Sequence, residues 1–269
     1  MRFSPLPRVV RYFLFLLLIL TLFAPMPFVI LEPGPATDVL GPVVTVPSQF
    51  ADKVPHPSGK LMLTTVSIST PNSKVIGLEV LLRWIQGDAV VVPKSVVYDA
   101  KVDVEKINKE SLAEMDGSQK SAIAAALNYL NKNEPELAPY LRSGELNEQQ
   151  INFNLDNTGG PSGGLIFALG IIEKLNSAQL VQGRFIAGTG TINKKGEVGP
   201  IGGIQDKLIG AKRAGATLFI APIDNCVDIG NIPKGLQIVA VSTLAQAVDL
   251  LKKPAQALAR LPQVSGCSK

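Results

Sequence analysis

Two residues of this 269-residue sequence could act as a nucleophile and its base. Ser162 lies in N-T-G-G-P-S-G-G (Asn157 to Gly164), and Lys207 lies in P-I-G-G-I-Q-D-K-L-I-G-A-K-R-A-G (Pro200 to Gly215). A serine hydroxyl needs a neighbouring base to remove its proton. The G-x-S-x-G pattern around Ser162 would require a histidine after the serine, but the one histidine, His56, precedes it. A Ser-His-Asp triad in that order is therefore excluded, and a Ser-Lys pair is the recognised alternative.

The residues around Ser162 predict a strand, a turn and a helix. I-N-F-N-L from Ile151 to Leu155 alternates between apolar and polar residues, which is typical of a half-buried strand. G-L-I-F-A-L-G-I-I-E-K-L from Gly164 to Leu175 reads as a buried helix. Backbone N–H groups near Gly160 and Gly163 would then face a developing oxyanion at the helix N-terminus. The alternative is an ordinary serine N-cap on a packed helix.

Lys207 would lie on the apolar face of a second helix. In a helix that begins near Gly203, the lysine shares one face with Ile204, Leu208 and Ala211, at three- and four-residue spacing. Apolar burial lowers the pKa of a lysine, as a base near neutral pH requires. The alternative is a surface lysine with a packed stem and an ammonium group in water.

These segments resemble the proteolytic domain of the Lon family of serine proteases. The family's serine loop reads D-G-P-S-A-G, and G-G-P-S-G-G from Gly159 to Gly164 aligns with it. The run from Pro200 follows the Lon pattern P-I-G-G-x-x-E-K-x-x-A-A-x-x-A-G, and T-G-T-I from Thr189 falls on T-G-E-I. The resemblance implies that Ser162 is the catalytic nucleophile, that Lys207 is its base and that Thr189 supports them. An ordinary strand threonine is the alternative for Thr189.

The resemblance also implies a fold and an assembly. Lon proteolytic domains have a ribosomal-protein-S5-domain-2-like α/β (α+β) architecture and commonly form hexameric rings, so a homo-oligomer is expected by analogy alone.

Two residues depart from the family pattern. Gly159 stands where many Lon enzymes have Asp, which removes a carboxylate from the loop. Gly163 replaces an alanine, which removes a methyl group and adds backbone freedom.

The N-terminal segment is apolar from Val9 to Leu31 and carries Arg2, Arg8 and Arg11 at its start, with no acid before Glu32. About twenty apolar residues can span a bilayer, and basic residues before them favour a cytoplasmic N-terminus. We therefore expect a single transmembrane helix in the cell membrane with the catalytic domain on the extracytoplasmic side. A cleaved signal peptide is the alternative, because A-P-M-P interrupts the run.

Two segments after this run resemble bacterial membrane-anchored Lon-like proteases: E-P-G-P-A-T-D-V-L-G-P-V-V-T-V (Glu32 to Val46) and S-G-K-L-M-L-T-T-V-S-I (Ser58 to Ile68). Those relatives usually carry a PDZ module before the serine loop, but the interval from Tyr98 to Ile151 is too short and too helical for one. The predicted organisation is an N-terminus with a membrane anchor or signal peptide, a Pro-rich linker with a first strand, a Lon-like protease domain and a C-terminal tail, over residues 1–31, 32–57, 58–255 and 256–269.

Composition and missing motifs narrow the function. Without the three N-terminal arginines the chain has 23 basic and 22 acidic residues, so a nucleic-acid surface is not indicated. No Walker A sequence is present, which predicts that this chain acts without its own ATPase, either by cleaving unfolded or extended protein segments or by relying on a partner. No cofactor and no metal are expected. Cys226 and Cys267 form no metal-ligand cluster, and both a disulfide and two free thiols stay open.

The sequence therefore predicts a serine endopeptidase that acts on proteins or peptides. One alternative is a non-catalytic, membrane-tethered binding module on the same fold, which the joint presence of Ser162, Lys207 and Thr189 disfavours. The other is a secreted esterase or amidase, which the missing downstream histidine disfavours.

Overall fold

The computed structural model describes residues 7–51, 58–87, 89–98, 103–155, 158–175, 179–258 and 260–267. His56 and Asn157, which the sequence motifs include, lie outside these residues. The chain divides into two compact units, one formed by Met1–Glu32 with Ser67–Val104 and the other by Pro33–Val66 with Glu105–Lys269. Both candidate catalytic side chains belong to the second unit.

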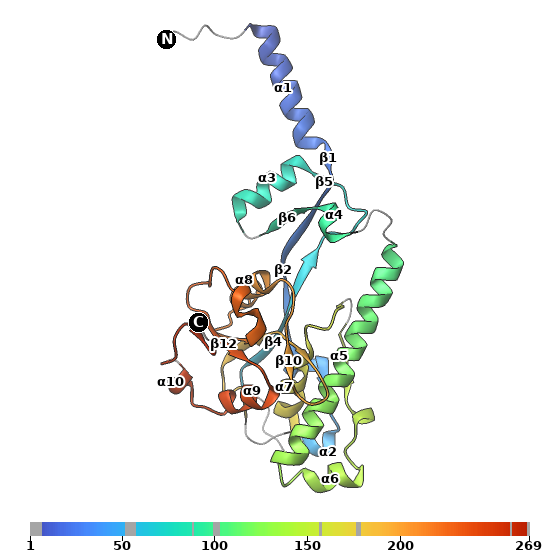
Figure 1. Cartoon of the computed structure of the whole chain (residues 1–269), viewed down its shortest axis with the longest axis vertical. Coiled ribbons are helices and arrows are strands. Elements are labelled where there is room, and N and C mark those ends of the chain that lie inside the picture. Colours follow the sequence, from blue (N-terminus) through green and yellow to red (C-terminus); the bar gives the residue numbers. More distant parts are fainter. Residues whose placement is uncertain are drawn as a thin grey trace. The chain divides into compact units, whose positions relative to one another are not determined.

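A largely parallel sheet forms the centre of the second unit, with the strand order β13-β12-β11-β8-β4-β2. Figure 1 labels β12, β4 and β2 of this sheet. The four neighbouring pairs from β13 to β4 are parallel. Parallel strands are normally covered on both faces, and the apolar runs of β8 and β11 agree with that rule. The strands are β2 (Phe28–Asp38), β4 (Lys60–Ile68), β8 (Phe185–Gly188), β11 (Leu218–Pro222), β12 (Gln237–Val241) and β13 (Val264–Ser265).

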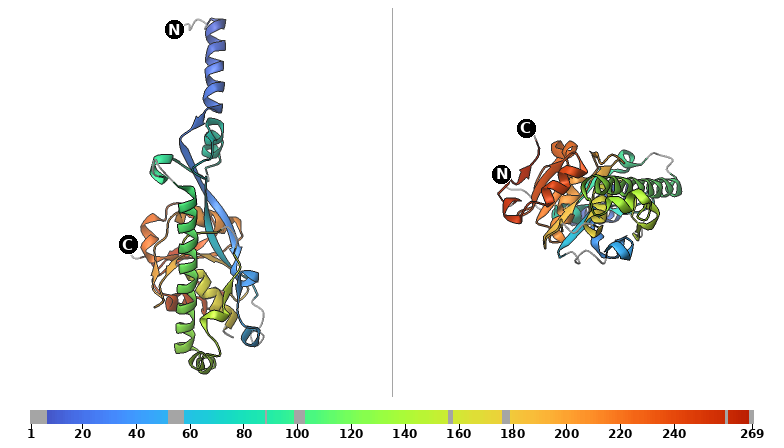
Figure 2. Two further views of the ribbon diagram at one scale, coloured as in Figure 1. Left: turned by 90° about the vertical axis from the view of Figure 1, so that its right-hand side faces the viewer. Right: turned by 90° about the horizontal axis from the view of Figure 1, so that it is seen from below.

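Successive residues of these strands enter two different cores. In β4, Leu61 and Leu63 join one apolar cluster, whereas Met62 joins the other. The larger cluster contains side chains of α5 (Val104–Asn133), α7 (Gly164–Leu175) and α9 (Leu244–Leu251), and the smaller one contains side chains of α8 (Ile204–Arg213). The sheet therefore lies between α7, which follows the turn of Ser162, and α8, which carries Lys207. The two further views in Figure 2 show α5 running lengthwise along this unit.

Shorter elements complete the second unit. Two small antiparallel sheets pair β3 with β7 and β9 with β10. The predicted strand at Ile151–Leu155 is present but short, because only β7 itself is paired. The elements are η1 (Val39–Val43), β3 (Val44–Thr45), α2 (Ser48–Ala51), α6 (Ala138–Ser143), η2 (Glu148–Gln150), β7 (Asn152–Phe153), β9 (Thr191–Ile192), β10 (Val198–Gly199), η3 (Ile223–Asp228) and α10 (Ala255–Leu258).

The first unit begins with α1 (Arg8–Phe23), which buries none of its residues. Its other elements are β1 (Pro25–Met26), β5 (Val75–Ile76), α3 (Gly77–Gln86), β6 (Val90–Pro93), α4 (Lys94–Val97) and the first residues of β2. Here β1 pairs with β5, and Phe28 to Leu31 of β2 pair with β6, both in the antiparallel sense.

The prediction of one apolar helix through Leu31 is corrected by this unit. The helix ends at Phe23, and the apolar residues from Phe28 onward belong to a strand. Pro25 and Pro27 explain the break, because proline cannot donate a backbone hydrogen bond and disfavours helical conformation in the preceding residue. Among the residues that the structure describes, we find no helix with the length and apolar character needed to cross a bilayer.

Cys226 and Cys267 form a disulfide with a Cα–Cα distance of 5.7 Å. Cys226 lies in η3, and Cys267 follows β13. Of the two alternatives that the sequence left open, the structure has the paired one.

Candidate active site

Ser162 occupies a tight turn between β7 and α7, two residues before the helix begins. The turn depends on Gly160, whose φ of +83° lies in the left-handed region that side-chain-bearing residues rarely adopt. The backbone N–H of Gly160 donates to the carbonyl of Ser111 in α5 at 2.9 Å. The predicted strand–turn–helix context of the serine is thus present, with α7 spanning the predicted residues.

The carbonyl of Ser162 is also held from the opposite side of the turn. It accepts hydrogen bonds from the Thr189 hydroxyl at 3.0 Å and from the Gly190 backbone N–H at 2.8 Å. Gly190 in turn accepts from the backbone N–H of Leu165 at 3.0 Å. These bonds connect the turn to the segment between β8 and β9, so the position of Ser162 depends on this segment as well as on α5.

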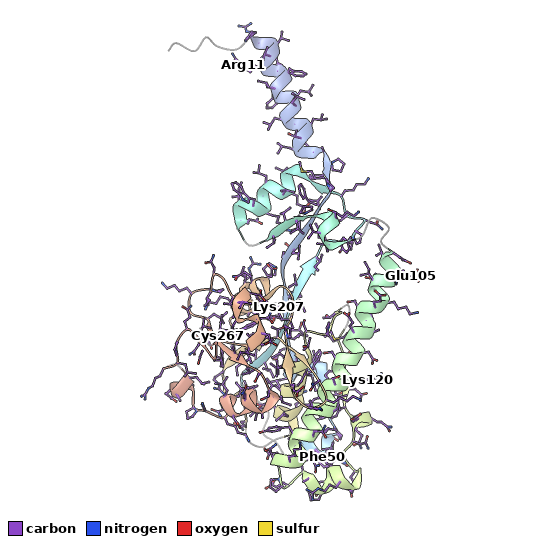
Figure 3. The ribbon with its side chains drawn as sticks, viewed as in Figure 1. Arg11, Phe50, Glu105, Lys120, Lys207 and Cys267 are labelled. Carbon is purple, nitrogen blue, oxygen red and sulfur yellow. A yellow bond between two sulfur atoms is a disulfide. The ribbon has the colours of Figure 1, made fainter. Side chains whose placement is uncertain are left out.

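Lys207 reaches Ser162 from the first half of α8. Its Nζ lies 2.7 Å from the Ser162 Oγ and 3.1 Å from the Thr189 Oγ1. The lysine is 3% exposed, and Ile204, Leu208 and Ala211 on the same helix face are also buried, as predicted. Burial lowers the pKa of Lys207 from 10.5 to about 8. Figure 3 labels this side chain on α8.

The hydrogen bonds of Thr189 determine which group can give a proton to the lysine. The Thr189 hydroxyl has one proton, which it donates to the Ser162 carbonyl, so toward Lys207 it acts only as an acceptor. When the lysine is neutral, its lone pair can accept a proton only from the Ser162 hydroxyl among these partners. Thr189 is fully buried, and the arrangement orients the amine toward the serine.

The predicted oxyanion-binding stretch, from Gly160 to Gly163, contributes fewer N–H groups than expected. The Gly160 N–H is used by Ser111, and Pro161 has no N–H. The N–H groups of Ser162 and Gly163 remain, and within the described residues they donate to no protein acceptor. They precede the first turn of α7, where the helix dipole adds positive potential.

Two glycines that depart from the Lon pattern have packing explanations. A Cβ at Gly163 would lie 2.8 Å from Phe167 Cε2 and 3.0 Å from Leu63 Cδ1, so an alanine would fit only if these two side chains shifted. A Cβ at Gly159 would lie 2.0 Å from Ser111 Oγ. The expectation that Gly163 merely adds freedom is therefore incomplete, because side chains of α7, β4 and α5 also pack closely against these glycines and would have to move to admit a larger residue.

Sequence reasoning missed two polar residues that hold the catalytic segments. Ser118 is 5% exposed, and its hydroxyl donates to the Pro161 carbonyl at 2.9 Å. The sequence could have indicated Ser118, because it lies on the same face of α5 as Ala122 and Ala125, both of which are buried. A polar residue on an apolar helix face needs a partner, and here the partner is the residue before the nucleophile.

Asn225 has the corresponding place beside the lysine helix. It is 2% exposed, and its amide donates to the Ile201 carbonyl at 2.8 Å and accepts from the Ile201 N–H at 2.9 Å. Ile201 lies three residues before α8, so this pair of bonds fixes the entry to the helix that carries Lys207. No local pattern in the sequence singles out Asn225.

We also examined the described residues for a metal site and found no group of three or more His, Cys, Asp or Glu residues that could hold an ion. Asp206, next to the candidate lysine, is buried, and burial raises the pKa of its carboxyl. The lowered pKa of Lys207 has burial as its cause.

Residues 92–254 match the Lon protease (S16) C-terminal proteolytic domain, which is more than half of the chain. The chain belongs to this family. Lon proteolytic domains are serine peptidases, and the turn of Ser162 and the helix of Lys207 both lie within the matched residues.

Similar proteins agree with the family. Lon protease 1 of Bacillus subtilis (strain 168) is 39% identical over 90 residues, which are 34% of this chain and 11% of that protein. Lon protease 1 of Sorangium cellulosum (strain So ce56) is 32% identical over 132 residues, 46% and 16% of the two chains. The Lon protease of Trichlorobacter lovleyi is 29% identical over 154 residues, 56% and 18% of the two chains. The chain thus spans less than a fifth of the length of these relatives.

Proposed function

We propose that this member of the Lon proteolytic family is a serine endopeptidase in which Ser162 is the nucleophile and Lys207 the general base. The observation that carries the proposal is the 2.7 Å contact between Lys207 Nζ and Ser162 Oγ, inside a site that lowers the pKa of the lysine to about 8. Hydrogen-bond reach and a pKa near the working pH are the two requirements for a general base.

The steps follow from the geometry. The Ser162 Oγ attacks the scissile carbonyl while its proton moves to Lys207 Nζ, and the N–H groups of Ser162 and Gly163 bind the oxyanion. The intermediate collapses, the C–N bond breaks, and the lysine gives its proton to the leaving amine. A water molecule, deprotonated by the neutral lysine, then attacks the acyl carbon. The bond from this carbon to Ser162 Oγ breaks, and the lysine returns its proton to Oγ, so that the acid product leaves and both side chains are restored. Thr189 keeps the amine aimed at the serine throughout.

We infer that the substrates are unfolded or extended protein segments, cleaved without ATP hydrolysis by this chain. A cavity of about 490 Å³ between α5, η2 and β7 offers room for part of an extended segment, although neither Ser162 nor Lys207 is among the residues that line it. Phe153 in its wall meets Phe167 in an edge-to-face contact with ring centroids 4.8 Å apart, and Phe167 adjoins Gly163 of the serine turn. The lining residues are Asp116, Gln119, Lys120, Ile123, Glu148, Gln149, Ile151, Asn152, Phe153 and Lys194.

A fluorophosphonate probe tests the nucleophile and base together. We expect the probe to label the wild-type protein and the Lys212→Ala variant, because Lys212 is a second lysine of α8 whose Nζ donates to the Gly235 carbonyl at 3.2 Å, away from the serine. Ser162→Ala and Lys207→Ala should lose labelling. Strong labelling of Lys207→Ala would reject the lysine as the base.

Cleavage of an unfolded protein tests the substrate class. We expect the full chain to cleave casein at the same rate with and without ATP, and to leave a stable folded protein intact. A requirement for ATP, or activity only on small esters, would contradict this part of the proposal. Light scattering on the same sample tests the hexameric ring, which rests on analogy with the family.

We further propose attachment to the cell membrane through the N-terminal segment, with the peptidase unit on the extracytoplasmic side. Two observations support this placement: the apolar side chains of α1 are exposed on all sides, and the Cys226–Cys267 disulfide is of a kind that persists in oxidising compartments. Protease added to intact cells after wall removal should reach the second unit, and thiol alkylation before reduction should leave both cysteines unmodified. Protection of the unit until lysis would contradict this placement, whereas a shortened chain in the medium would indicate a cleaved signal peptide.

A further inference from the structure

The helix α3 in the first unit exposes its apolar face. Leu81, Leu82, Trp84 and Ile85 are 41%, 50%, 76% and 68% exposed. At helical spacing, Leu81, Leu82 and Ile85 share one face, and Trp84 adjoins Leu81 on its flank. A surface helix normally turns such a face toward a protein core. Contiguous exposed apolar residues of this kind mark an interaction surface.

The charged residues of α3 lie away from this face. Glu79 is in the first turn, and Arg83 pairs with Glu32 of β2 at 2.8 Å. At 100° per residue both project from the side opposite Leu81 and Ile85. The apolar face therefore carries no charge, while the opposite side is held to the body of the unit by an ion pair. A helix with this division and a tryptophan among its apolar residues fits the plane of a membrane interface.

The start of α3 lies against the end of α1. α3 begins where α1 ends: β1 follows α1, pairs with β5, and β5 leads into α3 (Figure 1). At Gly77, the first residue of α3, a Cβ would lie 2.4 Å from the Thr21 carbonyl and 3.3 Å from the Leu22 Cα. This close approach fixes the start of α3 against the last turn of α1. A lipid bilayer that takes α1 into its apolar region would therefore meet α3 at the boundary between its acyl chains and its headgroups.

We propose that α3 is a membrane-interface helix, which lies along the lipid surface with Leu81, Leu82, Trp84 and Ile85 inserted between headgroups and acyl chains. The partner is a lipid bilayer. The proposal rests on the membrane attachment proposed above and adds a second, in-plane contact beyond α1. Such a contact would hold the first unit in one orientation to the bilayer, whereas α1 alone would leave it free to rotate.

The chain contains a single tryptophan, so its fluorescence reports on α3 directly. The full-length protein is reconstituted with vesicles of phosphatidylcholine and phosphatidylglycerol, and flotation measures membrane attachment. We expect the emission of Trp84 to shift to shorter wavelength on reconstitution. Lipids brominated near the headgroup end of the acyl chain should quench it more strongly than lipids brominated near the methyl end.

A pair of matched variants separates α3 from α1. Leu82→Glu places a charge on the exposed face of α3, and Leu112→Glu makes the same change at a leucine of α5 that is 58% exposed. Leu82→Glu should still float but lose most of the quenching, whereas Leu112→Glu should keep both. Circular dichroism melting checks that each variant is folded.

Three results would overturn the proposal. Flotation without a blue shift or quenching of Trp84 would show that α1 attaches the protein while α3 stays in water. Stronger quenching from the methyl end would show that α3 does not lie at the interface. Failure of the full-length protein to float would remove the membrane attachment as well, but it would leave the serine peptidase proposal intact, because fluorophosphonate labelling tests that separately.

Discussion

Two lysines in the second unit have lowered pKa values because of burial, but their surroundings differ. Lys174, near the end of α7, donates to the carbonyl of Gly41 at 2.8 Å and to that of Val44. Lys207 faces the hydroxyls of Ser162 and Thr189. A carbonyl can only accept, so it uses the amine as a donor, whereas a serine hydroxyl can also give a proton to the amine. Burial makes a lysine easier to neutralise, and the partners decide whether it can then act as a base.

Replacing each lysine with alanine should give the largest difference between the two sites, in cleavage rate and in stability. Lys207→Ala should lower the rate of peptide cleavage by about 10⁴-fold or more, because the serine loses its base. Lys174→Ala should keep the rate within several-fold and should lower the stability instead, since the partly buried carbonyls of Gly41 and Val44 lose their donor. Steady-state cleavage and thermal unfolding of both variants measure the contrast. Equal activity losses in the two variants would contradict the assigned roles.

The pH dependence should report Lys207 and not Lys174. The neutral amine is the active form, and its pKa is about 8, so the cleavage rate should rise about tenfold per pH unit below pH 8 and level off above it. Between pH 6 and the plateau the expected increase is about a hundredfold. A pH–rate profile of the wild type and of Lys174→Ala should give the same midpoint. A maximum near pH 5 would point to a carboxylate as the base.

The buried lysine should also reduce the stability of the fold. Its pKa is about 8 in the folded protein and near 10.5 when exposed, so the unfolded chain binds more protons between these values. Stability should therefore rise with pH from about 8 to 10.5, and below pH 8 the site costs about 3 kcal/mol.

Lys207→Met tests this cost. The variant should unfold at higher temperature near neutral pH, and its free energy of unfolding should rise by about 1–2 kcal/mol. The gain is smaller than the full cost of the buried lysine because the Ser162 and Thr189 hydroxyls lose a hydrogen-bond partner. Lys174→Met, which removes a lysine held by carbonyls, should show no gain. Calorimetry at pH 7 gives both values, and destabilisation by Lys207→Met would contradict the expected stability cost of the buried lysine.

The smallest effect is expected at the residue that holds the serine turn from α5. Ser118→Ala removes one hydrogen bond to the Pro161 carbonyl, worth about 1 kcal/mol, so the maximal rate should fall roughly fivefold. Because Ser118 does not contact the lysine, the midpoint of the pH profile should not move, and Ser118→Thr should restore part of the rate. A shifted midpoint would show that the residue acts on the base.

The elements of the site were predictable because their signals are local. The glycine-rich run placed Ser162 in the turn before α7, and the apolar spacing in α8 placed Lys207 on the buried face of that helix. Ser118 had a local signal, because it lies on the apolar face of α5, but its partner Pro161 is set by a tertiary contact, and no local pattern singles out Asn225. The N-terminal run failed as a single helix because apolar character does not distinguish a helix from a buried strand, and prolines decided the division. The packing around Gly163 likewise depends on residues distant in the sequence.

The disulfide has a consequence for the durability of the second unit. Cys226 and Cys267 are 41 residues apart, and closing a loop of that length restricts the unfolded chain by about 4 kcal/mol in the loop-entropy treatment. Such a contribution is comparable to much of the net stability of a typical domain. The bond joins the C-terminal strand of the sheet to η3, whose Asn225 supports the entry to α8. The working lifetime of the lysine helix should therefore depend on the thiol redox state of its surroundings, even though neither sulfur takes part in the chemistry.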